Sequence, residues 1–150
     1  MIQVLVLGIG NRLMMDDGIG VYMVETLIER NKNPCIQYVV GETDIYYCLK
    51  HIEKASYAII VDAAYFDKEP GAISTISLEQ ALNNSIYSIS IHESHLLDEI
   101  KKTFKSIEGL FIGIEPYEIN YYFGLSATLQ EQYFKIVDEI ENIINHKMFP

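Results

Sequence analysis

Short apolar runs alternate with segments of helical periodicity along this chain, a pattern typical of βα units around a mostly parallel sheet. The apolar runs predict strands over residues 2–8, 35–41, 57–62, 71–77, 86–91 and 109–114. We therefore predict an α/β fold, a three-layer sandwich with a mostly parallel twisted sheet between helices. The run 71–77 follows a polar turn with Pro70 rather than a helix, which makes it a candidate antiparallel edge strand.

Four segments carry apolar residues at helical spacing. The first is expected to begin near Asp17, a good N-cap residue, and to end by Pro34. Two more are expected over 43–53 and from about 93 to 105. The last follows Thr128-Leu129-Gln130-Glu131, which fits a capping box, and its apolar stripe continues to residue 144. This helix should cover one face of the sheet.

Length and composition limit the class of protein. A chain of 150 residues is one ordinary domain, so we assign residues 1–150 to a single domain. The formal net charge of −10 repels phosphate backbones, which argues against nucleic acid as a partner. No run approaches the roughly 18 apolar residues of a membrane helix, and the N-terminus lacks a cationic leader. We therefore expect no membrane partner, a cytoplasmic location, and reduced thiols at Cys35 and Cys48.

Polar side chains follow three of the predicted strands. Asp16 and Asp17 end the loop after the first, Asp62 follows the third, and His92 follows the run 86–91. If these strands are parallel, the side chains meet at one edge of the sheet, where open α/β folds bind ligands. Two carboxylates and one imidazole suit zinc, nickel or manganese, and three protein ligands leave a position for substrate or water. Asp17, Asp62 and His92 are thus the candidate metal site.

Each of these residues also has a purely structural interpretation. Asp17 alone would be an ordinary N-cap, Asp62 a turn former, and His92 a hydrogen-bonded polar residue. His95 lies three residues beyond His92, but we favour His92 as the ligand because it is expected at the end of a strand. The roles of four nearby residues stay open: Asp16, Glu42, Glu93 and His95.

Two other ligand-binding folds fit this sequence less well. The glycines after the first strand begin a dinucleotide-binding fingerprint, but Leu13 stands where its third glycine should be. A phospho-receiver domain would need a hydroxyl residue and a lysine where this chain has His92 and Glu115-Pro116. A receiver-like or other non-enzymatic metal-binding α/β module is the alternative to an enzyme.

Five motifs occur in order along the chain. They are Gly8-x-Gly10-Asn11 with Asp16-Asp17-Gly18-x-Gly20, Val61-Asp62-Ala63, Ser90-x-His92-Glu93, Gly113-Ile114-Glu115-Pro116 and Gly124-Leu125-Ser126. Together they resemble the motifs of the hydrogenase maturation proteases, from residue 2 to about residue 144. The acidic turn at 41–44 and the aromatic segment at 117–123 depart from the family pattern, so the hydrogenase subtype stays open.

The resemblance implies an endopeptidase that removes the C-terminal extension from the large-subunit precursor of a nickel-iron hydrogenase. It also implies that Asp17, Asp62 and His92 are the metal ligands and the catalytic set. The nickel would be supplied by the precursor, and zinc or cadmium could occupy the site in vitro. The metal would dock the cleavage site and polarise the scissile carbonyl or activate water. The sequence has no HExxH motif, serine elbow or catalytic Cys-His pair, so a protease of another class is not expected.

Overall fold

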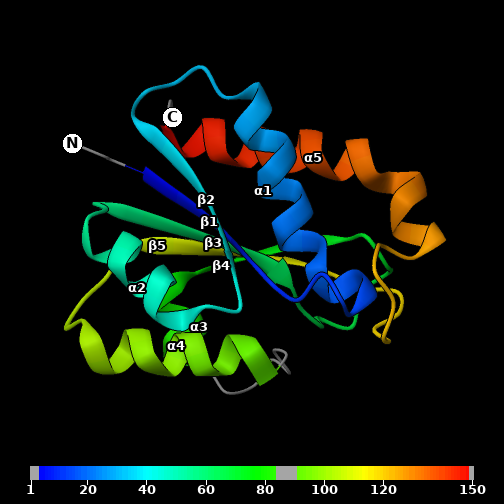
Figure 1. Ribbon diagram of the computed structural model, residues 1–150. Coiled ribbons are helices and arrows are strands. Elements are labelled where there is room, and N and C mark those ends of the chain that lie inside the picture. Colours follow the sequence, from blue (N-terminus) through cyan, green and yellow to red (C-terminus); the bar gives the residue numbers. More distant parts are fainter. Residues whose placement is uncertain (1–3, 84–90, 149–150) are drawn as a thin grey trace.

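A five-stranded sheet lies at the centre of the protein, as seen in a computed structural model that describes residues 4–83 and 91–148 (Figure 1). The side chains of residues 91–94 lie outside that description. The strands are β1 (Val4–Ile9), β2 (Ile36–Glu42), β3 (Tyr57–Ala63), β4 (Ile73–Ser77) and β5 (Gly109–Ile114). Their order in the sheet is β2-β1-β3-β5-β4, and every neighbouring pair is parallel except β4 with β5.

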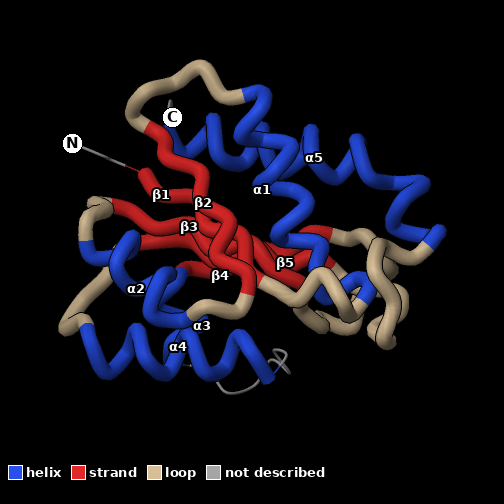
Figure 2. Tube along the Cα trace, in the orientation of Figure 1, coloured by secondary structure: helices blue, strands red, loops and turns tan. Residues whose placement is uncertain are grey.

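Helices cover both faces of this sheet (Figure 2). They are α1 (Ile19–Arg30), α2 (Ile45–Glu53), α3 (Leu78–Asn83), α4 (Ile91–Thr103) and α5 (Ala127–Met148). Helices α1 and α5 pack on one face, and α2, α3 and α4 on the other (Figure 1). Consecutive residues of β1 alternate between the two resulting apolar clusters, so Val6 packs under α1 and α5 while Leu7 packs under α2 and α4. The predicted three-layer α/β sandwich is confirmed.

The described helices also bear on the membrane prediction. None of them is long and apolar enough to cross a lipid bilayer.

Most of the predicted strands are present, with one correction. The antiparallel edge strand over 71–77 is confirmed as β4, because Ile73 to Ser77 pair antiparallel with β5 at the end of the sheet. Of the predicted strand 86–91, residues 86–90 lie outside the described residues, and Ile91 is the first residue of α4. Alternating apolar residues predict a strand up to Ile91, whereas the backbone of this residue already belongs to the helix that follows. The short helix α3 has no counterpart among the predicted elements.

Two helix starts differ from the predictions. Asp17 does not cap α1, because a 3-10 turn, η1 (Met15–Gly18), comes first and Gly18 is the N-cap residue. The capping box at Thr128 is also wrong, since α5 begins one residue earlier. Ser126 precedes it instead, and its Oγ accepts a hydrogen bond from the backbone N–H of Leu129 at 3.3 Å.

Close packing of backbone fixes the start of α1 against the sheet. A Cβ atom on Gly20 would clash with the carbonyl oxygen of Val61 and lie 2.7 Å from that of Ile9. Gly10, with a φ of 136°, leaves no space for a Cβ beside the carbonyl oxygen of Asp17. These glycines let the loop after β1 fold tightly over the carboxyl ends of β1 and β3.

Candidate active site at the carboxyl edge of the sheet

The loop after β1 and the end of β3 bring Asp17 and Asp62 to the same edge of the sheet. Strands β1 and β3 are parallel, with Gly8 paired to Val61, so the residues that follow each strand emerge together. The turn η1, which carries Asp17, packs against β3. Both carboxylates are buried, Asp17 with 3% and Asp62 with 0% of its surface exposed. The sequence expectation that these two residues share one edge is therefore correct, although the sequence does not indicate their burial.

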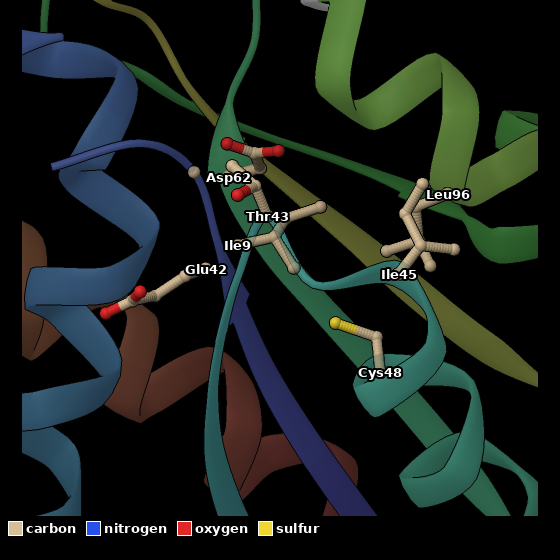
Figure 3. Close-up of a pocket in the computed structure, with 8 residues that line it drawn as sticks. Ile9, Glu42, Thr43, Ile45, Cys48, Asp62 and Leu96 are labelled. Carbon is tan, nitrogen blue, oxygen red and sulfur yellow. The ribbon is translucent and has the colours of Figure 1, made fainter. Parts of the chain in front are cut away.

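Asp62 lines a small pocket between the end of β3 and the helices on one face (Figure 3). The other lining residues are Ile9, Gly10, Glu42, Thr43, Ile45, Cys48 and Leu96. The cavity measures about 10 Å³, which is room for roughly one water molecule. One carboxylate oxygen of Asp62, Oδ1, accepts a hydrogen bond of 2.7 Å from the backbone N–H of Ala63, which fixes the side-chain rotamer.

Asp17 has the environment expected of a cation ligand. Its Oδ2 accepts a hydrogen bond of 2.9 Å from the backbone N–H of Asn11. Within the described part of the chain, no basic side chain forms an ion pair with this carboxylate. A buried carboxylate is costly unless its charge is compensated, so a bound cation fits this position.

His92 lies in the first turn of α4 and not at the end of a strand. Its side chain is outside the described part of the structure. The backbone nonetheless places it near the pocket, because Leu96 lines the pocket and follows His92 by one helical turn of the same helix. His95 is exposed on α4. Among the side chains that are described, no three His, Cys, Asp or Glu groups converge as a metal site. The set Asp17, Asp62 and His92 therefore stays a prediction.

Glu42 lines the pocket but its carboxylate points away from it, towards α1 (Figure 3). Its Oε1 accepts a hydrogen bond of 2.9 Å from Nε of Arg12. The same guanidinium binds both carboxylate oxygens of Glu25 on α1, at 2.6 and 3.0 Å. The hydrogen bonds that Arg12 donates to Glu25 and Glu42 raise the pKa of Arg12, so the guanidinium stays positively charged. Arg12 therefore links the loop after β1 to β2 and α1, and the carboxylate of Glu42 is occupied by its ion pair with Arg12.

Cys48 also lines the pocket, beneath Asp62 (Figure 3). Burial, with a smaller contribution from the charge of Asp44, raises the pKa of this thiol to about 12. The side chain is thus protonated at neutral pH, and the reactive thiolate form is suppressed. Cys48 belongs to the apolar cluster between α2 and the sheet.

Asp16 has a role that the sequence does not reveal. It is fully buried, and its carboxylate accepts hydrogen bonds from the backbone N–H groups of Tyr117 and Glu118, both at 2.9 Å. The backbone N–H and the Oγ of Ser126 donate to it as well, both at 2.8 Å. The donors lie more than one hundred residues away in sequence, so no local pattern could have indicated them. Asp16 holds the loop between β5 and α5 against the loop after β1.

We expect the substitution Asp16→Asn to lower the free energy of unfolding by about 3 kcal/mol. The amide has one acceptor oxygen, so at least one of the four donors would lose its partner. The remaining donors would bind a neutral oxygen in place of a charged one. Asp17→Asn is the matched control, because an amide oxygen still accepts the hydrogen bond from Asn11. Equal urea unfolding curves for the two variants would contradict this role.

Comparison with known proteins places the chain in a family. Residues 21–143 match the family model described as hydrogenase maturation protease. The chain belongs to the hydrogenase maturation protease family. It is 32% identical over 145 residues to a hydrogenase maturation protease predicted in Methanocaldococcus jannaschii, covering 95% of this chain and 94% of that one. It is 30% identical over 128 residues to the hydrogenase expression/formation protein HoxM of Azotobacter vinelandii, covering 81% of this chain but only 62% of HoxM.

Solved structures of maturation proteases share the fold. The nickel-iron hydrogenase maturation protease HybD of Thermococcus kodakarensis superposes with a TM-score of 0.76 at 27% identity, over 94% of this chain and 98% of that one. The hydrogenase maturating endopeptidase HybD of Escherichia coli superposes with a TM-score of 0.79 at 22% identity, over 97% and 93% of the two chains. The resemblance drawn from the sequence motifs is thus confirmed, and the family match supports a protease over a receiver-like module.

Proposed function

We propose that this maturation protease removes the C-terminal extension of the large-subunit precursor of a nickel-iron hydrogenase, after nickel has been inserted. The observation that carries the proposal is the pair of buried carboxylates, Asp17 and Asp62, at the carboxyl edge of the sheet in a chain of this family. Buried anionic side chains at this edge are typical of a binding site, because ligands of open α/β sheets bind there.

In this proposal Asp17, Asp62 and His92 bind the nickel that the precursor carries. The carboxylates supply two oxygen ligands and His92 supplies an imidazole nitrogen, a set that suits nickel. The small pocket beside Asp62 has room for roughly one water molecule, which is the second reactant that hydrolysis of a peptide bond requires. Binding the nickel would place the adjoining scissile peptide at this edge.

Incubation of the purified protein with nickel-loaded precursor tests the proposal. Intact-mass spectrometry is expected to show loss of a C-terminal peptide from the precursor, with both fragments accounted for. Precursor incubated alone controls for spontaneous cleavage. If the protein binds the precursor but the mass of the precursor stays unchanged, the protein would be a non-enzymatic binding module, and the proposal would be wrong.

A further inference from the structure

The loop between β5 and α5 holds a row of aromatic side chains in solvent. Tyr121, Tyr122 and Phe123 are 91%, 62% and 67% exposed. Tyr117 in the same loop and Leu13 in the loop after β1 are each 59% exposed. We call these five residues the aromatic rim. Soluble proteins seldom expose several large apolar side chains together unless the surface binds a partner.

The backbone of the aromatic rim is held in place by hydrogen bonds. The N–H of Tyr122 donates to the carbonyl of Leu13, and the carbonyl of Tyr122 accepts from the N–H of Met15, each at 3.0 Å. The carboxylate of Asp16 binds the N–H groups of Tyr117 and Glu118 on the other side of the loop. A surface fixed in this way loses little conformational entropy when a partner binds.

The aromatic rim adjoins the proposed nickel-binding residues. Leu13 and Asp17 belong to the same loop, and Asp16 joins that loop to the aromatic segment. Burial raises the pKa of Tyr65, which follows β3 and is 43% exposed, and the nearby charges of Glu115, Asp17 and Asp16 add to this effect. A partner seated on the aromatic rim would therefore also reach the site.

Carboxylates outnumber basic side chains in the loops that carry and adjoin this apolar surface. Glu118 is exposed within the loop, and Asp67, Lys68 and Glu69 are exposed in the neighbouring loop after β3. Glu115 joins the two loops, because its Oε1 accepts hydrogen bonds from the N–H groups of Phe66 and Lys68 at 2.8 and 3.3 Å. The surface is apolar at its centre and largely negative around it. The partner that fits it is a protein surface with exposed apolar side chains and basic residues beside them.

We propose that the aromatic rim is the surface on which the folded part of the hydrogenase precursor docks, outside the peptide that is cut. This inference rests on the proposed function and adds to it a second contact, independent of nickel. The aromatic side chains supply binding energy to the protein substrate, and Asp17, Asp62 and His92 engage the metal. Because the rim acts on docking and not on chemistry, its loss weakens binding while the nickel-binding residues remain intact.

The double variant Tyr121→Ala/Phe123→Ala tests the inference. Neither side chain is buried, so the fold should persist, and circular dichroism with thermal unfolding checks this. The matched control is Phe134→Ala, since Phe134 on α5 is exposed to the same degree, 65% against 67% for Phe123. Binding of nickel-loaded precursor is measured by calorimetry, and KM and kcat are measured by the mass assay.

The double variant is expected to bind the precursor at least about tenfold more weakly, with a similar rise in KM and little change in kcat. Phe134→Ala should behave as wild type. Equal affinities of the double variant and wild type would overturn the inference while leaving the protease function standing. An equal loss of affinity in Phe134→Ala would also overturn it, because the loss would then follow from removing any exposed apolar side chain and not from the aromatic rim. Failure of the wild type to bind or cut the precursor would refute the proposed function itself.

Discussion

The variant Asp62→Asn is expected to lose cleavage of the precursor by well over 100-fold while remaining folded. Substitution of a residue that only supports a metal ligand typically lowers metal affinity or activity by about 10- to 100-fold. Removal of a ligand itself should cost more. Asparagine has the size of aspartate and keeps an Oδ1 that can accept the hydrogen bond from Ala63. The variant should therefore remain folded, which circular dichroism checks.

The same result is expected for Asp17→Asn and His92→Ala, which remove the other two proposed ligands. Asp138→Asn is the matched control. It removes one exposed carboxylate from α5, where it pairs with Arg30 at 2.8 Å, and a surface ion pair of that kind contributes little to stability. The mass assay measures cleavage, and circular dichroism measures folding. Near-normal processing by Asp62→Asn would remove that residue from the site.

Precursor that lacks nickel is expected to stay uncut, which is the second large effect. Two carboxylates and one imidazole form an open set of three ligands, and such a set holds a metal less firmly than a closed four-ligand site. The precursor would therefore have to supply the nickel. The protease would then recognise the precursor only after nickel has been inserted into it. Mass spectrometry of nickel-loaded and nickel-free precursor, each incubated with the same enzyme preparation, measures the difference.

Two controls separate recognition of nickel from a general need for metal. Free zinc added to the enzyme should not restore cleavage of nickel-free precursor, because that metal would not be attached to the substrate. Reloading the same precursor with nickel should restore cleavage. Efficient processing of nickel-free precursor in the presence of a chelator would show that nickel is not the recognition element, while the protease function would stand.

Periodicity and strand ends are enough to predict much of this protein. Apolar alternation depends only on which residues face a core, so it locates the strands of the sheet and the antiparallel edge strand at 71–77. Parallel strands direct their carboxyl ends to one edge, so the positions of Asp17 and Asp62 after two such strands are sufficient to place them together. The family motifs then indicate a maturation protease, which the comparisons confirm.

Contacts between remote segments decide what periodicity cannot. Asp16 and Asp17 are adjacent in sequence, yet Asp16 binds four donors from residues 117–126 while Asp17 accepts from Asn11 within its own loop. The engagement of Glu42 by Arg12 and the Ser126 cap of α5 likewise depend on the folded loops. A hydrogen bond forms only where a donor lies within about 3 Å of the acceptor. Only the tertiary structure brings such donors together, and so only it shows that Asp16, and not its neighbour Asp17, joins the two loops.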